Sequence, residues 1–590
     1  MLYNIILYVL YFLFVDNLCS AVEITSPFCF GSISQNEYQA LYSLFSYTNG
    51  LHWSWSPLAP PSTVWNFPAN RSTPCTYRWQ GLNCTQIGPK LCSISSLSLV
   101  AKNMTGTVPV QISGLSQLNL IDLADNYLES KIPDNLFTIT SLQSINLASN
   151  YFSGNFCDCI ANLVNLQTFN VGFNRLVGVV PSVFLSLTNL MVLNLQSNAF
   201  SGSLPSFLGN MSSLTSLNLN LNKFQGELSP YLFNATKLVT MNFGNNFIVG
   251  SIPTEIGQLT NLQQLNFVSN RLTGSIPTEI GLLHQLQMVY LDNNRFHGKI
   301  PTEIGLMTSL QLMLIEVNFL TGSLPTEIGN LGSTLSQFSV YTNRLSGSIP
   351  SEIGLLTQIS LLYMSNNHFS YNIPDAIGTM TSMTDVDFGY NHLSGSIPTT
   401  IGTLKRLQYL FLSVNFLSST IPTEIGTMLR LSYFLAASNQ LISTIPTEFG
   451  SCNLLQALVL SDNMITGSIP PHLVNATRLQ YIFLNMLPLT GTVPNAINLW
   501  PNLICFESAL TLVTGTLPTQ LGEVTLLQYL EIYGSYLTGT IPNEIVGCHE
   551  LNIFSAGANF FTGTFPIGFQ SLAILSQLNI SQNMLTGKML

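Results

Sequence analysis

One proline-containing octapeptide recurs along most of this chain at a fixed spacing. Residues 274–281 read GSIPTEIG, and close copies stand at 250–257, 298–305, 322–329, 347–354, 419–426 and 443–450. Aligned on the proline, the chain gives twenty anchor positions 24 residues apart, with one step of 25 between Pro325 and Pro350. A fixed period of this length indicates a solenoid, in which each unit buries its apolar side chains against the next unit.

Each repeat begins with a short strand that is buried on one side. Leu265 and Phe267 alternate with polar neighbours, which is the period of a half-buried strand. Strands of successive repeats then stack in parallel at about 4.8 Å. Asn270 follows the strand, and asparagine recurs at this position in most repeats, where its amide can bond free backbone groups of the turn.

The second half of each repeat returns the chain along the outside. Gly274 suits a tight bend, and Pro277 has no N–H and so occupies a site that needs no ladder bond. Residues 278–281 predict a short helical or 3₁₀ turn that ends at glycine.

The full unit over 262–277 has the pattern LxxLxLxxNxLxGxIP, which resembles the leucine-rich repeat, in its plant-type extracellular class. The resemblance extends from Leu97 to the C-terminus. It implies an α/β solenoid, a right-handed superhelix of about 20 repeats of 24 residues with a parallel inner sheet, an outer face of 3₁₀ turns or short helices, and an N-terminal helical cap.

The first 92 residues lack the repeat. Residues 1–20 have the apolar run and small flanking residues of a signal peptide, with an uncleaved anchor helix as the alternative. Residues 21–92 are expected to form the cap, with a helix over 35–47 ended by Asn49-Gly50. Residues 93–590 form the solenoid, which stops inside a repeat, so we expect a C-terminal truncation.

The string Cys75–Cys84, with Trp79 and Gly81 inside it, resembles the disulfide-bridged segment of the plant-type cap, which implies a Cys75–Cys84 bond. In a secreted chain Cys29 and Cys92 are the next pair, because both flank the cap.

The sequence leaves the pairing of the remaining cysteines open, and Cys505 is one of them. Cys157 and Cys159 either bridge each other or stay free. Cys452 and Cys548 lie four repeats apart, about 19 Å at the strand spacing, which is too far for a disulfide. Because no CxxC pair or histidine cluster is present, we expect neither a metal site nor a cofactor.

Composition points to an extracellular recognition protein. Charged residues make up only 7% and the net charge is −10, which excludes nucleic acid as a partner. No later apolar run is long enough for a membrane span. Glycosylation is expected at sequons that a signal peptide would deliver to the right compartment. They are Asn70, Asn103, Asn210, Asn234 and Asn475, and with less support Asn83 and Asn579.

Two strand positions, eleven and thirteen residues before each anchor, define the concave face. In the first half this face carries a ladder of asparagines from Asn146 to Asn266, which we interpret as structural. In the second half it carries aromatic and acidic side chains, which either bind a ligand or stabilise the sheet as cross-strand pairs. The predicted ligand-binding residues are Tyr290, Tyr363, Asp385, Asp387, Tyr409, Phe411, Tyr433, Tyr481, Phe483, Glu507, Tyr529 and Glu531.

Asp385 and Asp387 resemble a catalytic carboxylate pair in spacing alone, because no histidine, nucleophile motif or phosphate loop accompanies them. We therefore expect no enzyme activity. Between about 480 and 540 the asparagine position becomes Leu487, Thr511 and Ser535, through decay of the repeat or to form a binding surface.

The main hypothesis is a secreted or cell-surface protein that binds a peptide, glycan or protein on the concave face between about 288 and 533. The resemblance implies the ectodomain of a receptor-like kinase or receptor-like protein, with any kinase domain and membrane span missing from this chain. The alternatives are a soluble inhibitor of a cell-wall-degrading enzyme, like the polygalacturonase inhibitors of the same class, and a structural or ice-binding array.

Overall fold

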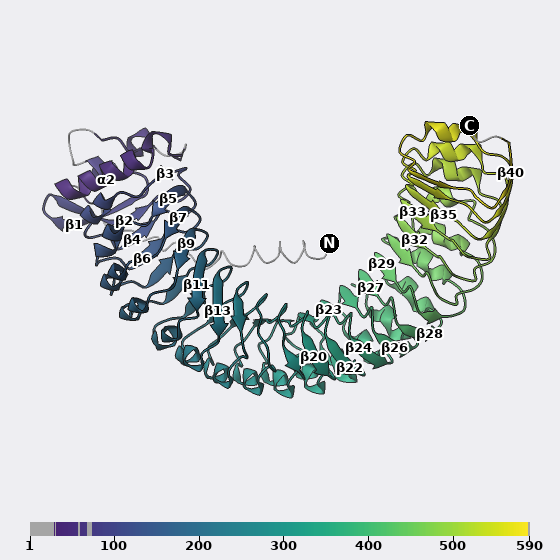
Figure 1. Ribbon diagram of the computed structural model, residues 1–590, viewed down its shortest axis with the longest axis horizontal. Coiled ribbons are helices and arrows are strands. Elements are labelled where there is room, and N and C mark those ends of the chain that lie inside the picture. Colours follow the sequence, from purple (N-terminus) through teal and green to yellow (C-terminus); the bar gives the residue numbers. More distant parts are fainter. Residues whose placement is uncertain (1–28, 30, 57–59, 68–72, 588–590) are drawn as a thin grey trace. The chain divides into compact units, whose positions relative to one another are not determined.

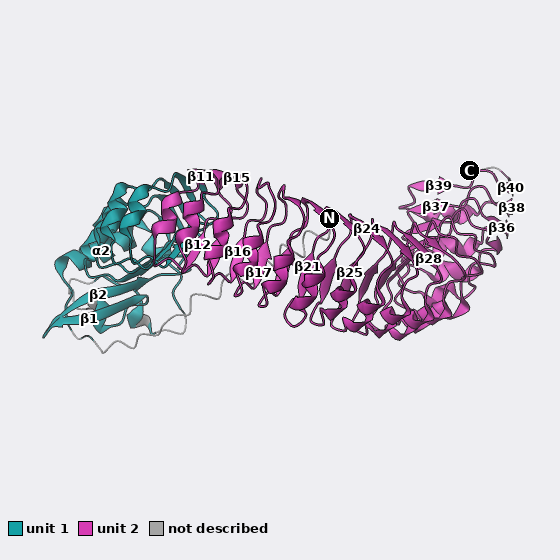
Figure 2. Ribbon diagram, turned by 90° about the horizontal axis from the view of Figure 1, so that it is seen from below, with its two compact units in different colours: residues 1–199 teal, residues 200–590 magenta. Residues whose placement is uncertain are grey.

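A computed structural model describes residues 29, 31–56, 60–67 and 73–587. The expected signal peptide and Asn70 lie outside these residues. The chain divides into two compact units, residues 1–199 and 200–590, which are described separately (Figure 2).

Unit 1 holds the cap and the first repeats. The expected helix is present as α2, Gln35–Tyr47, with Ser34 and Glu37 forming a capping box at its start. Strands β1 (Leu82–Gly88) and β2 (Leu91–Ser98) form an antiparallel pair, and β2 opens the parallel sheet. The parallel strands that follow are β4 (Leu120–Asp122), β6 (Ser144–Asn146), β8 (Thr168–Asn170) and β10 (Val192–Asn194).

The cap is held by disulfides and by an aromatic cluster. Cys29 bonds Cys92 and Cys75 bonds Cys84, which are the two pairs that the sequence indicated. Trp65 stacks on Trp79 with ring centroids 5.6 Å apart. Helix α2 packs against the first outer turn, η3 (Val110–Gly114), and so covers a layer that would otherwise face water.

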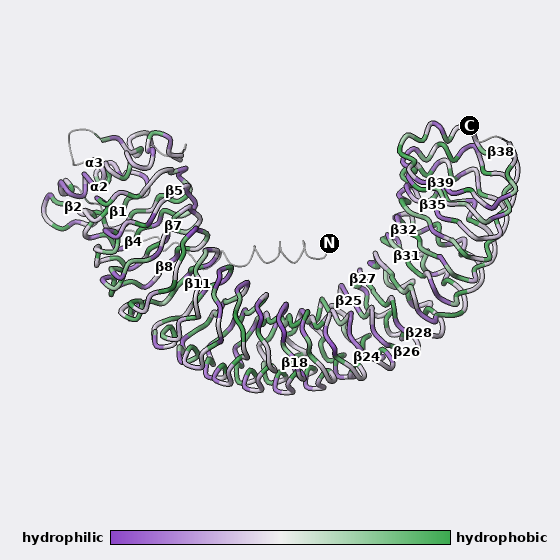
Figure 3. The backbone as a smooth tube through the Cα atoms, in the orientation of Figure 1, coloured by the Kyte–Doolittle hydropathy of each residue, from purple (hydrophilic) through white to green (hydrophobic). Residues whose placement is uncertain are grey.

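Unit 2 is a stack of near-identical repeats whose strands line its concave side and whose 3₁₀ turns line the opposite side (Figure 1). Hydrophobic and hydrophilic residues alternate along each coil (Figure 3). Its inner strands are β12 (Ser216–Asn218), β14 (Thr240–Asn242), β16 (Gln264–Asn266), β17 (Met288–Tyr290), β19 (Leu312–Leu314), β21 (Gln337–Ser339), β23 (Leu361–Tyr363), β25 (Asp385–Asp387), β27 (Tyr409–Phe411), β29 (Tyr433–Leu435), β31 (Ala457–Val459), β32 (Tyr481–Phe483), β33 (Cys505–Glu507), β35 (Tyr529–Glu531), β37 (Ile553–Ser555) and β39 (Gln577–Asn579).

Successive inner strands pair in parallel with a register of one repeat. Tyr409 lies opposite Tyr433, and Phe411 opposite Leu435. The central residue of a strand, such as Leu410, is fully buried. The leucine core therefore lies behind the sheet, and the residues on either side of each central position face the concave side.

The recurring asparagine joins each repeat to its predecessor. Asn391 Oδ1 accepts a hydrogen bond from the N–H of Phe369 at 3.0 Å, and its Nδ2 donates to the carbonyls of Met364, Phe388 and Gly389 at 3.1, 3.2 and 3.0 Å. The same set of bonds recurs from repeat to repeat. Each buried amide thus satisfies backbone groups of a turn and of the preceding coil.

The two irregular places have local explanations. The extra residue before Pro350 lengthens one outer turn, η12 (Thr326–Leu331), to six residues where neighbouring turns such as η10 (Thr278–Leu282) have five. Where the asparagine is lost, Thr511 and Ser535 bond each other and the carbonyl of Ser508.

A second, lateral set of strands is interrupted twice. It stops between β15 (Phe247–Val249) and β18 (His297–Gly298), where the asparagines are kept, and again between β30 (Gln440–Leu441) and β34 (Thr514–Gly515), around the repeats that lose the asparagine; the last stretch ends at β40 (Met584–Thr586). Leu487 lies between β30 and β34 and is buried, but its side chain has no amide with which to bridge two coils. The fraying that the sequence showed is therefore confined to the lateral side, while the inner strands continue through it.

Replacing Asn391 with alanine should lower the free energy of unfolding by about 2–4 kcal/mol, because four backbone groups lose their partner inside the core. Urea unfolding followed by circular dichroism measures this. Asn330→Ala, at an exposed position of η12, is the control and should change stability by less than about 0.5 kcal/mol. Equal effects of the two variants would contradict the role assigned to the ladder.

Candidate binding face

The predicted ligand-binding residues lie together on the concave side of unit 2. All twelve are partly exposed, while the central residues between them, such as Phe434 and Ile482, are buried. The tyrosines of the later repeats therefore do not point into the leucine core. Nothing in the structure tests what these residues bind, so their role in ligand binding stays a prediction.

Aromatic rings gather at two places on this face. Tyr409 and Tyr433 stack with centroids 4.9 Å apart and an interplanar angle of 14°, and Phe411 lies 6.2 Å from Tyr409. Tyr481 and Phe483 pair at 6.3 Å on β32. Between the two groups, β31 presents only the small side chains of Ala457 and Val459 to the same face.

These rings contact neighbouring side chains as well as each other. The Tyr433 hydroxyl donates to Oε1 of Gln456 at 3.0 Å, and burial raises the pKa of Tyr433, with Tyr409 and Tyr481 adding to the shift. Stacking therefore contributes to the sheet, as the structural alternative held, but the exposed ring edges remain open for contact.

Both carboxylates of β25 accept a hydrogen bond from a group close by in the chain. Asp387 Oδ1 accepts from the N–H of Gly389 at 2.9 Å, and Asp385 Oδ2 accepts from Thr384 Oγ1 at 2.5 Å. Burial raises the pKa of both groups. Asp387 thus caps the turn after its strand, while Asp385 bonds the hydroxyl of the preceding residue.

Glu507 links the second aromatic group to its neighbours. Its Oε2 accepts from Asn485 Nδ2 at 2.5 Å, and its Oε1 accepts from the Cys505 thiol at 3.4 Å. Burial and this carboxylate raise the pKa of Cys505, so the thiol stays protonated. Glu531 lies opposite Glu507 on the next strand.

The asparagine ladder at the start of the array is structural. Asn170 Oδ1 accepts from the N–H two residues later at 3.1 Å, and Asn194 and Asn242 do the same at 3.0 and 3.2 Å. These amides cap the ends of their own strands, and Asn146 also bonds the Asp122 carboxylate of the preceding repeat, so the ladder supports the sheet.

Sequence reasoning missed two acids on the same face. Asp292 and Glu316 lie nine residues before their anchors, one step beyond the positions considered from the sequence. They are 8% and 3% exposed, and burial raises the pKa of Asp292 to about 6 and, with the Asp292 charge, the pKa of Glu316 to about 8. Extending the same alternation by two residues would have found them.

A lateral stripe of aromatic and basic side chains was also missed. Arg271 stacks over Phe247 at 5.1 Å, and Arg344 over Phe319 at 4.9 Å. His368 and His392 continue the stripe with centroids 5.5 Å apart. These residues stand six places before their anchors, and their regular spacing was the available signal.

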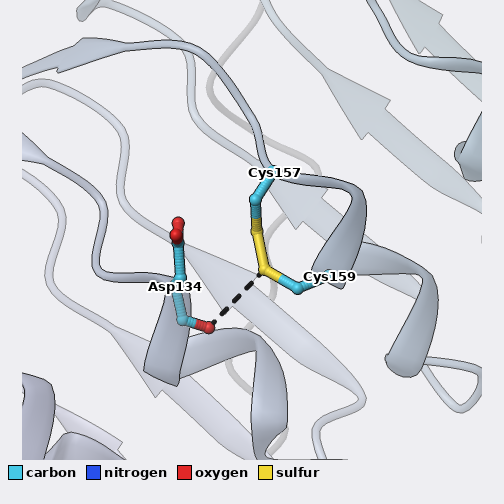
Figure 4. Close-up of side chains that lie close together, drawn as sticks. All are labelled: Asp134, Cys157 and Cys159. Atoms are coloured by element: carbon cyan, nitrogen blue, oxygen red, sulfur yellow. Dashed lines mark hydrogen bonds between the residues drawn. A yellow bond between two sulfur atoms is a disulfide. The ribbon is translucent and has the colours of Figure 1, made fainter.

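The cysteines outside the cap do not form a metal site as they stand. Cys157 and Cys159 bond each other, and the Cys159 sulfur lies 3.8 Å from the main-chain oxygen of Asp134 (Figure 4). Their sulfurs and the Asp134 carboxylate lie within 4.8 Å, but disulfide sulfurs are not thiolate ligands. Within the described part of the chain Cys452, Cys505 and Cys548 are unpaired and buried.

Four of the predicted glycosylation sites, Asn103, Asn210, Asn234 and Asn475, have exposed side chains. The last three end outer 3₁₀ turns, away from the concave face. Their modification stays a prediction.

Comparison with known proteins identifies the family to which this fold belongs. Leucine-rich-repeat family models match residues 164–224, and 141–163, 261–283 and 454–476. The crystal structure of a TDR receptor is 32% identical with a TM-score of 0.80, over 83% of this chain and 84% of that one. The chain belongs to the leucine-rich-repeat family, in its plant-type extracellular class. A sequence comparison with curated proteins found no match.

Two further leucine-rich-repeat structures are similar over most of their length. The Arabidopsis receptor kinase HAESA, in complex with the peptide hormone IDA and the co-receptor SERK1, is 29% identical with a TM-score of 0.82, over 94% of this chain and 90% of that one. The plant peptide hormone receptor RGFR1, in complex with RGF2, is 29% identical with a TM-score of 0.74, over 86% and 91%.

These similarities favour a ligand-binding ectodomain over the inhibitor and the structural array. RGFR1 is a peptide hormone receptor, and a further HAESA match, 27% identical with a TM-score of 0.74 over 94% of each chain, is the leucine-rich-repeat ectodomain of that receptor kinase. Among the described residues, no helix combines the length and apolar character needed to cross a bilayer.

The stability of this leucine-rich-repeat protein should fall as pH rises from 5 to 8. The folded-state pKa values of Asp292, about 6, and Glu316, about 8, lie above their ordinary values, so the stabilisation is complete below about pH 4 and is lost as pH rises through 6 and 8. We expect a loss of about 1.4 kcal/mol per pH unit for each proton. Thermal unfolding across this range measures the slope. Glu316→Gln should remove most of this pH dependence, whereas Glu303→Gln on the outer turn should leave it unchanged. The same slope in both variants would assign the pH dependence to other groups.

Proposed function

We propose that the chain is an extracellular recognition module that binds a peptide or a protein segment along the concave face between about residues 288 and 533. One observation carries this proposal: partly exposed aromatic and acidic side chains are concentrated on one face of a rigid sheet. Aromatic side chains give a large contact area at a small cost in conformational entropy, and tyrosine adds a polar tip.

The similar structures support a peptide as the ligand class. RGFR1 is bound to RGF2, HAESA to the peptide hormone IDA, and a further match, 25% identical, is a complex of PEPR1 with AtPEP1. An extended peptide suits a face whose side chains repeat at the spacing of the strands, because each residue of the peptide meets a new rung.

The stacked tyrosines are proposed as anchors. The Tyr409–Tyr433 pair and the Tyr481–Phe483 pair flank the small residues of β31, so a ligand side chain lying over β31 would contact rings on both sides. Glu507 and Glu531 extend this region with negative charge. Together they match a ligand that carries apolar and basic groups.

In this proposal the chain has no catalytic activity of its own, acts outside the cell or at its surface, and depends on other parts or partners for signalling. Residues 1–20 direct secretion, residues 21–92 cap the array, and residues 93–590 carry the binding face. Glycans on the outer turns would leave that face open.

The triple variant Tyr409→Ala, Tyr433→Ala, Tyr481→Ala should lose at least 90% of the peptide captured from extracellular fluid of the source organism. Capture on the immobilised protein is quantified by mass spectrometry of the eluted peptides. The midpoint of thermal unfolding should fall by only a few degrees, because the rings are partly exposed.

The matched control removes three exposed aromatic rings from the lateral side, as Phe416→Ala, Tyr536→Ala, Phe560→Ala. This variant should keep its captured peptides. Unchanged capture by the tyrosine variant together with a large loss of stability would show that the tyrosines are part of the scaffold and overturn the proposal.

A further inference from the structure

Asp292 and Glu316 are neighbours on the concave face of unit 2. They occupy the same position in successive repeats, and the N–H of Asn293 donates to the carbonyl of Glu316 at 3.0 Å, which joins the two chain segments directly. In the other repeats this position carries small, amide, apolar or tyrosine side chains, such as Gly244, Asn220 and Ser413. The acidic pair therefore departs from the residue types of the other repeats, and the scaffold folds there without such acids.

The buried oxygens of this pair have unused bonding capacity. Asp292 Oδ1, Glu316 Oε2 and Ser339 Oγ are buried and have no partner at hydrogen-bond geometry among the described residues. The other oxygen of Asp292, Oδ2, accepts from Asn293 Nδ2 at 3.0 Å, and the Ser339 hydroxyl is near enough to Glu316 to lower the pKa of that carboxyl slightly against the larger effect of burial. Ser339 stands on the next strand and is 2% exposed. A buried carboxylate with an oxygen that lacks a donor carries a large desolvation cost.

A second buried glutamate shows how the fold treats an acid that belongs to the scaffold. Glu37 is also 3% exposed, yet Ile94 N–H donates to its Oε1 at 2.9 Å and the Ser34 N–H and hydroxyl donate to its Oε2 at 2.9 and 2.8 Å. By this comparison, both oxygens of Glu37 have donors, whereas Asp292 Oδ1 and Glu316 Oε2 each lack one.

Two tyrosines border the pair. Burial, and after it the Asp292 charge, raises the pKa of Tyr290 to about 12, and burial, then Glu316 and Asp292, raises the pKa of Tyr341 to about 12. Both phenols therefore remain neutral and offer ring faces. The nearest basic residues in sequence, Arg295 and Lys299, are exposed and lie beyond the inner strand.

We propose that Asp292 and Glu316, with Ser339 and the rings of Tyr290 and Tyr341, form a subsite for a guanidinium group of the bound peptide. This inference rests on the proposed function and names a chemical feature of its ligand. A planar guanidinium presents several donors in a fixed fork that two carboxylates can accept, and aromatic rings favour a cation next to them.

A metal ion fits the same residues less well. Calcium takes roughly six to eight oxygen ligands, whereas the side chains here supply two carboxylates and one hydroxyl. The neighbouring backbone carbonyls are already engaged, as Glu316 O is with Asn293 and Asp292 O is with Ser269.

Without ligand, a proton takes the place of the cation. The protonated Glu316 carboxyl can donate its O–H to Asp292, which satisfies both orphan oxygens. A bound guanidinium replaces that proton, so binding releases it to solvent. Affinity for the cation should therefore rise with pH, by up to tenfold per pH unit below about pH 8.

The test uses Nα-acetyl-arginine methylamide as the probe and the matched citrulline compound as its neutral isostere. Saturation-transfer NMR on the secreted protein at pH 6 and pH 8.5 should show saturable arginine binding that is at least tenfold tighter at pH 8.5. The citrulline compound should not saturate at either pH. Equal binding of the two compounds, or no arginine binding, would overturn the subsite.

Two variants complete the test. Asp292→Asn with Glu316→Gln keeps the shape and should lose at least tenfold in arginine affinity together with the pH dependence. Glu303→Gln, on the outer turn η11 (Thr302–Leu306), should retain both. A rise in the unfolding midpoint with millimolar calcium in the native protein only would assign the acids to a metal ion instead.

The outcome separates this subsite from the proposed function. Tyr409, Tyr433 and Tyr481 lie on later repeats, so their triple variant should bind the arginine probe as the native protein does. Arginine binding with unaffected peptide capture in that triple variant would leave the subsite standing and reject the tyrosine face. Loss of peptide capture in the triple variant, together with no arginine binding by the native protein, would support the tyrosine face and reject the subsite.

Discussion

The buried asparagine that closes most of the inner strands is the interaction on which the rest of this protein depends. Its oxygen accepts from the preceding coil, and its amide donates to carbonyls of its own turn and of the coil before, as Asn270 does with Ile248, Phe243, Phe267 and Val268. A solenoid has no second layer to satisfy these backbone groups. The asparagine supplies the bonds and at the same time fixes the offset between coils, which keeps the leucines in register.

Because that register is fixed, the concave face could be predicted from the sequence by counting. The helix Gln35–Tyr47, the parallel strands, the outer 3₁₀ turns and the place of the extra residue before Pro350 all followed from the period and from local turn chemistry. The side-chain direction at Tyr409 and Tyr433 followed in the same way. Such agreement between local pattern and fold is what a repeat sequence provides.

What the sequence could not provide was the state of individual side chains. The alternation places Asp387 and Asp292 on one face, but only coordinates show that the first caps a backbone N–H and that the second keeps an oxygen without a donor. Likewise, Thr511 and Ser535 replace the lost amide by bonding each other, which depends on a distance between two coils rather than on either residue alone. The repeat period alone does not determine such distances between pairs of side chains.

A repeat protein also offers an internal comparison that single-copy folds lack. Each strand position is sampled about twenty times, so the residue types tolerated by the scaffold are visible within one chain. At the position of Asp292 and Glu316 those types are mainly glycine, alanine, serine, asparagine and tyrosine, all of which avoid a buried charge. Two adjacent acids there raise the free energy of the folded state wherever they are ionised. The other repeats fold without an acid at this position. The presence of Asp292 and Glu316 is therefore better explained by a ligand than by a need of the scaffold.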